Sequence, residues 1–262
     1  MTTFYGMPNS GAFWHWPTLI HFVLVALAGG MALVAAIRAW QDDENSRILA
    51  FIALALIALD FLTLWGESSA RFRLTHIWLF LSFQPLAYIW LGAWGLIISA
   101  IMSLLIAFKL GSKRVWAAIM MLSATIVLLY PGLALAANSN RPLWTPLLLA
   151  FFPLTSLLMV LGIGQFRWEW AKPYFLPLSL LGAIFGGMYL VSLSFGGLEA
   201  KEALHHFMQE GGWLYSLALL LMLAGSFLLK RFPALAGLLA VAGAILARSL
   251  IIEIGQYQGF GF

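Results

Sequence analysis

The stretch PTLIHFVLVALAGGMALVAAIR, residues 17–38, decides the fold. It is almost wholly apolar and long enough to cross a bilayer as a helix, which takes about 20 residues. Similar stretches follow along the chain, and each is continuously apolar, whereas a membrane-spanning strand alternates over about ten residues. The sequence therefore predicts an all-α integral membrane protein with eight transmembrane helices, at residues 17–38, 48–65, 89–108, 115–137, 146–166, 174–195, 212–229 and 233–254.

The composition supports the membrane class. Of the 262 residues, 63% are hydrophobic and 9% are charged, whereas a soluble domain carries about 25% charged residues. The spans leave only short loops, so we expect a single domain over residues 1–262. The absence of cysteine excludes disulfides and thiolate-held iron–sulfur clusters within this chain. The net charge of +4 does not indicate nucleic-acid binding, because the basic residues are few and scattered.

The basic residues also predict the orientation. The first, third, fifth and seventh connections hold nine lysines and arginines, and the others hold four. Since the positive side is cytoplasmic, both termini are expected outside. The eight predicted helices are compatible with an arrangement in two four-helix bundles. The nine residues are Arg38, Arg47, Lys109, Lys113, Arg114, Arg167, Lys172, Lys230 and Arg231, and the four are Arg71, Arg73, Arg141 and Lys201.

Two connections and two glycine pairs stand out. Residues 67–88 are rich in arginine and aromatics but too polar to span, so we expect them along the outer surface. Residues 196–212, GGLEAKEALHHFMQEGG, predict a short exposed helix bordered by glycines. The pairs Gly29-Gly30 and Gly186-Gly187 predict close helix packing, because small residues let helices approach in membranes.

Polar side chains within the spans are candidate functional residues, because an ionisable group is costly in hydrocarbon. The candidates are His21, Asp60, Glu67, Tyr130, Arg248 and Glu253. At 1.5 Å per residue the deepest lie roughly 6–10 Å below the outer surface, and the inner halves of the spans carry almost no such group. This asymmetry disfavours a proton or ion path across the whole membrane. It favours a site open to one side.

Such a site suits a molecule with a polar head and an apolar tail, such as a quinone. His21 and Tyr130 can donate to quinone oxygens and relay a proton, and Asp60 and Glu67 can pass protons to water. Other interpretations stay open: an interfacial histidine, an aromatic-belt tyrosine, and an Asp60 that is protonated or paired, with Arg248 as one candidate partner. Only His21 lies clearly within a span, which disfavours a haem held by two histidines. No metal site is expected.

Four segments carry a resemblance to a known family. They read FYGMPNSGAFWHWPTLIHFVLVALAGGMAL at 4–33, LDFLTLWGESSARFRLTHIWLFLSFQP at 59–85, YPGLALAANSNRPLW at 130–144 and ARSLIIEIGQYQGFGF at 247–262. These segments resemble the membrane subunit of bacterial polysulfide reductase, of the NrfD/PsrC family. The resemblance implies an eight-helix anchor in the bacterial inner membrane that oxidises menaquinol, or ubiquinol, near the outer face.

The resemblance also implies partners and site residues. A four-cluster iron–sulfur subunit and a molybdopterin catalytic subunit are expected on the periplasmic side, where the terminal substrate reacts. Asp60 and Glu67 fall on the family's proton route, with His21 and Tyr130 as its catalytic pair. Thr18 stands where the family pattern has asparagine, and its hydroxyl can still donate. The implied quinone-binding positions are His21, Tyr130, Thr18 and Arg248.

Other functions and arrangements remain open at this point. A transporter or channel predicts discontinuous helices with polar groups on both sides, and a structural anchor predicts no quinone chemistry. A dimer of the whole complex is also open. Residues 67–88 and 138–144 are the expected docking surface, with Arg71, Arg73 and Arg141 available to meet acidic groups. The sequence decides neither the terminal substrate nor the direction of electron flow.

Overall fold

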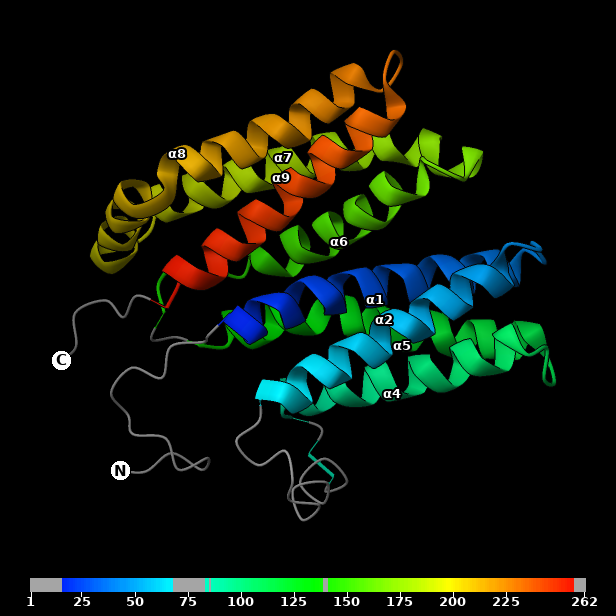
Figure 1. Cartoon of the computed structure of the whole chain (residues 1–262). Helices are drawn as coiled ribbons and strands as arrows, with labels where there is room; N and C mark the ends of the chain where they lie inside the picture. The colour runs from blue at the N-terminus through cyan, green and yellow to red at the C-terminus, as the bar shows by residue number, and fades with distance from the viewer. Residues whose placement is uncertain (1–15, 68–82, 85, 139–140, 257–262) are drawn as a thin grey trace.

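The computed structural model is helical throughout most of the part of the chain that it describes, residues 16–67, 83–84, 86–138 and 141–256. No strand occurs in these residues, so the all-helical prediction is confirmed for them. A 3-10 turn, η2 (Glu169–Ala171), is the one short element there. The eight long helices are α1 (Trp16–Trp40), α2 (Ser46–Glu67), α4 (Tyr88–Ala107), α5 (Lys113–Ala136), α6 (Leu148–Gly164), α7 (Lys172–Ser194), α8 (Leu198–Leu228) and α9 (Pro233–Ile254) (Figure 1).

The lengths of these helices fit a membrane. Seven of those described are long and apolar enough to cross it. The eighth, α6, has 17 residues, which gives about 26 Å at 1.5 Å per residue and nearly matches the hydrocarbon thickness. Large apolar side chains such as Leu122 and Phe227 lie exposed on the outside of the helices, as lipid contact requires. The chain is therefore a multi-pass membrane protein.

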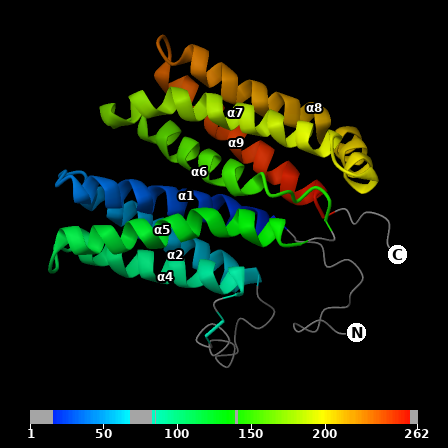
Figure 2. The same ribbon diagram turned by 180° about the vertical axis from the view of Figure 1, so that it is seen from behind.

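The helices pack in two sets of four. Helices α1, α2, α4 and α5 pack on one another, and α6, α7, α8 and α9 pack on one another (Figures 1 and 2). The two sets meet where α6 contacts α1 and α5, and α1 also contacts α9. Helix α1 therefore lies at the boundary between the sets.

Glycines allow the close contacts between these helices. A Cβ atom at Gly29 would lie 2.7 Å from Cγ1 of Val127 on α5, and close approaches occur also at Gly30 and Gly186. The predicted packing role is thus confirmed at these three glycines. It is wrong for Gly187, where a Cβ would meet nothing within 4 Å.

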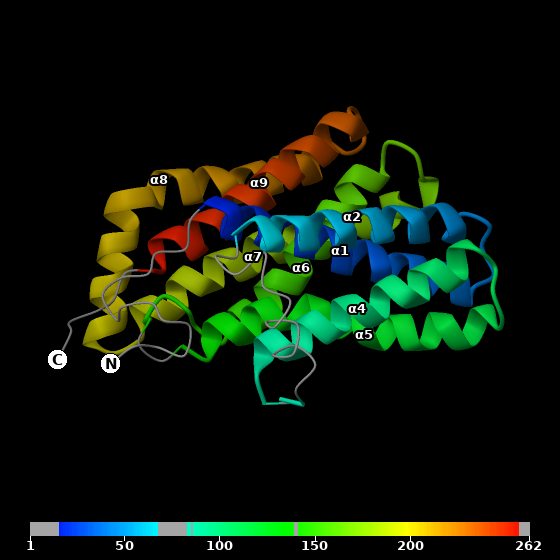
Figure 3. The same cartoon turned by 60° about the horizontal axis from the view of Figure 1, so that its bottom comes forward.

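Helix α8 differs from the prediction. Instead of a short exposed helix over 196–212 followed by a span, one helix runs from Leu198 to Leu228. Its first turns bend away from the rest (Figure 3). The predicted glycine border is confirmed at the start of the helix, where Gly197 directly precedes Leu198. It is wrong at Gly211, which lies inside the helix. The missing side chain of Gly211 makes room for α9, since a Cβ there would lie 2.6 Å from Cδ1 of Ile254.

The connections separate the two ends of the molecule. Helices α1, α4, α6 and α8 end at one side of the molecule, and α2, α5, α7 and α9 end at the other, where α1 begins (Figure 1). The first end carries the nine basic residues that predict a cytoplasmic side. Most of the long connection, with Arg71 and Arg73, lies outside the described residues.

Candidate functional site

Three helices of the first set bring His21, Asp60 and Tyr130 together. His21 lies in the second turn of α1, Asp60 about two turns before the end of α2, and Tyr130 near the end of α5. All three positions are therefore at the same end of the set. At 1.5 Å per residue they lie roughly 8–10 Å from the helix ends. The sequence-based estimate of a shared depth agrees with this placement.

The three side chains form a continuous hydrogen-bonded row, which we call the Tyr130–His21–Asp60 row. The hydroxyl oxygen of Tyr130 lies 2.7 Å from Nε2 of His21, and Nδ1 of His21 lies 2.7 Å from Oδ1 of Asp60. The relative exposures are 6% for Tyr130, 8% for His21 and 0% for Asp60. With Asp60 ionised, its oxygen can only accept, so Nδ1 of His21 carries the proton and Nε2 accepts from the Tyr130 hydroxyl. A proton can pass along such a row.

Helix α4 fixes the first member of the row. Gly92 lies against the ring of Tyr130, and a Cβ atom there would come 2.5 Å from its Cγ. The bare backbone of α4 therefore forms the surface on which the ring rests. The sequence interpretation missed Gly92. Its signal was the spacing of Gly92 and Gly95, which places two small residues on nearly the same face of an apolar helix.

The other end of the row is incompletely bonded. Oδ2 of Asp60 is buried and has no hydrogen-bond partner among the described residues. A buried carboxylate oxygen without a hydrogen-bond partner costs free energy, so its presence calls for a functional explanation. Glu67 lies seven residues later, almost two full turns of α2, and thus on the same side of the helix. Its side chain falls outside what the structure describes.

Arg248, one candidate partner for Asp60, is not its partner in the structure, because Asp60 pairs with His21. Helix α2 packs on α1 and α4, whereas Arg248 belongs to α9 in the other set. The guanidinium of Arg248 instead donates four hydrogen bonds of 2.8 to 3.2 Å to α1 and α6. Their acceptors are the main-chain oxygens of Phe22 and Phe152 and the hydroxyls of Thr155 and Ser156.

The environment of Arg248 explains how a cation is buried there. The side chain is almost wholly buried, and its guanidinium carbon lies 4.2 Å from the ring centroid of Phe152. Carbonyl dipoles, hydroxyls and a ring face replace the carboxylate partner that a buried cation usually needs. One acceptor belongs to Phe22, the residue after His21, so Arg248 ties α9 to the helix that carries the row. Sequence reasoning missed these partners, because hydroxyls and carbonyls of apolar helices give no distinctive pattern.

The remaining predicted residues lie around the row. Thr18 is buried one turn before His21 and thus on the same face of α1. Glu253 is exposed in the last turn of α9 and has no part in the row. Arg141, in the connection after α5, lies with its guanidinium carbon 5.3 Å from the ring centroid of Trp144, and partial burial lowers its pKa from the usual value. Arg141 therefore sits at the same end of the molecule as the row.

The site offers hydrogen bonding and proton relay rather than metal ligation. Among the described residues, no group of three or more histidines, cysteines or carboxylates is placed to hold a metal ion. Tyr130 and His21 instead provide a hydroxyl and an imidazole at the edge of a buried carboxylate. Such groups can donate and accept hydrogen bonds and relay a proton in an apolar surrounding.

A comparison with protein families identifies the family of the chain. A model described as polysulfide reductase, of the NrfD type, matches residues 1–262. The chain belongs to this family. Since the match covers the whole length, the resemblance seen in the four segments is confirmed. Family membership indicates a membrane anchor subunit of an oxidoreductase complex, associated with redox partner subunits. No curated protein matches this NrfD-family chain.

Proposed function

We propose that this NrfD-family protein is the quinone-reactive membrane anchor of a molybdopterin and iron–sulfur oxidoreductase complex. It oxidises menaquinol near the outer face and passes the electrons to an iron–sulfur partner subunit. The observation that carries the proposal is the Tyr130–His21–Asp60 row, which places a hydroxyl, an imidazole and a buried carboxylate in hydrogen-bond contact roughly 8–10 Å below the helix ends.

The residues of the row fit a quinol head group. The oxygen of Tyr130 can accept a hydrogen bond while its own proton is donated to His21, and Thr18 adds a hydroxyl one turn away on α1. Tyr130 and Thr18 would therefore contact the head group directly, and His21 would hold it through the Tyr130 hydroxyl. Arg248 keeps α1 and α9 together beside it. When bound, a quinol supplies two electrons and two protons.

The row provides the first part of a proton route. A proton taken up at Nε2 of His21 allows the proton on Nδ1 to move toward Asp60, whose Oδ2 has no partner in the described part of the chain. Glu67 lies further along the same side of α2, so protons would leave by Asp60 and Glu67 toward the outer water. On this account two protons are released outward and none is pumped.

The electrons must leave through another protein. The chain has no cysteine to hold an iron–sulfur cluster, and its family is associated with redox partner subunits. We place the iron–sulfur and molybdopterin subunits on the outer face of the bacterial inner membrane, over the end that holds the row. Residues 138–144, with Arg141, and the connection 67–88 would contact them there.

The test is quinol oxidation by the assembled complex with His21→Phe. Phenylalanine keeps the ring but removes both nitrogens of the row, so we expect the rate to fall at least about 100-fold, the usual contribution of a proton-transfer group. His205→Phe is the matched control, because His205 is exposed on α8, far from the row in sequence, and its imidazole bonds to Gln209 on the same helix. Quinol oxidation at full rate in His21→Phe would contradict the proposal and favour a structural anchor without quinone chemistry.

A further inference from the structure

A second polar cluster lies at the opposite end of the first helix set. A hollow of about 560 Å³ opens between the α1–α2 connection and the α4–α5 connection. This volume lies within the range of about 300–1,000 Å³ that small-molecule sites occupy. Its apolar wall comes from Leu105, Ile106 and Leu110, and its polar wall from the two connections. The hollow is thus built at the boundary between the helices and the aqueous side.

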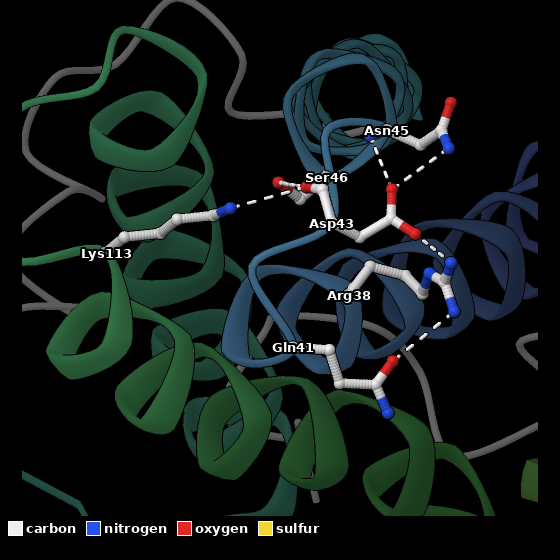
Figure 4. A network of polar contacts seen from close by, with 6 residues as sticks. All are labelled: Arg38, Gln41, Asp43, Asn45, Ser46 and Lys113. Atoms are coloured by element: carbon white, nitrogen blue, oxygen red, sulfur yellow. Dashed lines mark hydrogen bonds and ion pairs between the residues drawn. The ribbon is translucent and has the colours of Figure 1, made fainter.

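Two of the carboxylates at this hollow already have cationic partners. Asp43 forms an ion pair with Arg38 and accepts hydrogen bonds from the main chain and side chain of Asn45 at 2.6 and 2.9 Å (Figure 4). Asp42 pairs with Arg114 at 2.9 Å and, at the longer distance of 3.9 Å, with Lys113. Neither Arg38 nor Arg114 lines the hollow, whereas Lys113 does. The closest cationic partner of each aspartate therefore lies outside the hollow.

Three cations remain on the polar wall of the hollow. Arg47 uses its Nε to donate to the oxygen of Ala107 at 3.1 Å, and its two terminal nitrogens have no partner within the described ranges. Lys109 makes no hydrogen bond or ion pair with any described residue. Lys113 donates to the main-chain oxygen of Asp43 at 3.3 Å and lies 3.9 Å from Oδ1 of Asp42. These groups are positioned to bind further oxygen atoms.

The remaining charges leave the hollow positive. With both aspartates paired, Glu44 is the carboxylate that opposes Arg47, Lys109 and Lys113. A guanidinium and two ammonium groups around one space match the oxygens of a phosphate, which accept from both kinds of donor. The charge of the hollow therefore favours an anion.

An apolar face continues from the hollow along α2 and α4. Ile48 and Phe51 are exposed on α2, Leu104 is exposed on α4, and Phe108 is exposed directly after the end of α4. The rings of Phe51 and Phe108 meet edge to face, with centroids 5.4 Å apart. In a membrane this face contacts acyl chains. The whole feature is therefore amphipathic: a positive hollow at the boundary with an apolar face beside it.

We propose that this hollow binds the head group of an anionic phospholipid. Arg47, Lys109 and Lys113 donate to its phosphate oxygens, and its acyl chains lie along the exposed face of α2 and α4. The arginine and lysine count predicts this end to be cytoplasmic, and basic pockets between transmembrane helices on that side suit anionic lipid. The bound lipid would hold the two connections together at the end opposite the Tyr130–His21–Asp60 row.

The test is lipid binding to the full chain in neutral detergent, measured by native mass spectrometry. The probes are phosphatidylglycerol, phosphatidylcholine with the same acyl chains, and inorganic phosphate. We expect phosphatidylglycerol to bind several-fold more tightly than phosphatidylcholine. Lys109→Gln should weaken phosphatidylglycerol binding about fivefold, the usual effect of one basic residue near a lipid surface, and leave phosphatidylcholine binding unchanged.

A matched variant and a second substitution keep the test decisive. Lys230 is exposed in the α8–α9 connection at the same end but outside the hollow, so Lys230→Gln should leave both affinities unchanged. Arg47→Gln should weaken phosphatidylglycerol binding as Lys109→Gln does. Equal affinity for the two lipids, or an equal loss in Lys230→Gln, overturns the proposal. Inorganic phosphate that binds as tightly as phosphatidylglycerol assigns the hollow to a free anion and also overturns it.

Discussion

In the set formed by α1, α2, α4 and α5, a buried tyrosine, a histidine and an aspartate bond to one another across helices, whereas in the set formed by α6 to α9 the two fully buried tyrosines bond to the main chain. His21, Asp60 and Tyr130 form one row. Tyr189 and Tyr215 are equally buried, yet each hydroxyl donates to a main-chain carbonyl, at 2.8 and 3.1 Å. A carbonyl cannot take up and pass on a proton, but an imidazole can. The difference therefore separates an arrangement that is chemically able to relay a proton from arrangements that only hold helices together.

Arg248 marks the boundary between these two arrangements. It is the largest of the fully buried side chains in the described residues, and it bonds to α6 in its own set and to α1 in the other. Its bonds end on carbonyls and hydroxyls, as do those of its own set. It thus holds the helix that carries His21 without joining the row.

The largest difference between the two sets is expected when one buried tyrosine hydroxyl is removed from each. Tyr130→Phe removes the donor to His21, so quinol oxidation by the assembled complex should fall about 100-fold. Tyr215→Phe removes a bond to a main-chain oxygen and should leave the rate within about twofold, while costing about 1 kcal/mol of stability. Steady-state rates and melting temperatures check both. Equal loss of rate in the two variants would contradict the division into two sets.

A smaller effect is expected from Asp60→Asn. The amide oxygen can still accept from Nδ1 of His21 but cannot share a proton with it, so kcat should fall about 10-fold to 100-fold with little change in KM for quinol. Steady-state kinetics at several quinol concentrations separate the two constants. A rise in KM with kcat unchanged would instead assign Asp60 to head-group binding.

The smallest effect is expected from a substitution in α4 that tests whether this helix positions the Tyr130 ring. Gly92→Ala places a Cβ atom against the Tyr130 ring, and such overpacking costs about 1–3 kcal/mol. We expect a lower melting temperature and a several-fold loss of quinol oxidation. Gly187→Ala in α7 is the matched control, because its added Cβ meets nothing within 4 Å. The same loss in both variants would mean that Gly92 does not position the ring.

The membrane helices could be predicted closely, because long apolar runs mark every span. The exception is α8, whose first 14 residues are polar enough to read as a separate segment although they continue the same helix. Hydropathy reports which surfaces face lipid, and it does not report whether a helix stops at the membrane surface. The interpretation of Gly211 as a helix border failed for a similar reason, since a glycine can either end a helix or let a neighbouring helix approach closely.

The depth of the site could be predicted as well, but its pairing could not. The rise of 1.5 Å per residue fixes how far His21, Asp60 and Tyr130 lie along their helices. It does not say which helices are neighbours, and Arg248 remained one candidate partner for Asp60 for this reason. Gly92 was missed because its role depends on the ring of Tyr130 on another helix.

The proposed binding of quinone at the Tyr130–His21–Asp60 row is tested most directly by measuring quinone binding to the isolated chain. A menaquinone analogue should quench tryptophan fluorescence saturably in the unmodified protein and in Tyr189→Phe/Tyr215→Phe. In His21→Phe/Tyr130→Phe the saturable quenching should disappear, because both groups that hold the head group are gone. Unchanged affinity in His21→Phe/Tyr130→Phe would contradict the account and move the quinone site elsewhere.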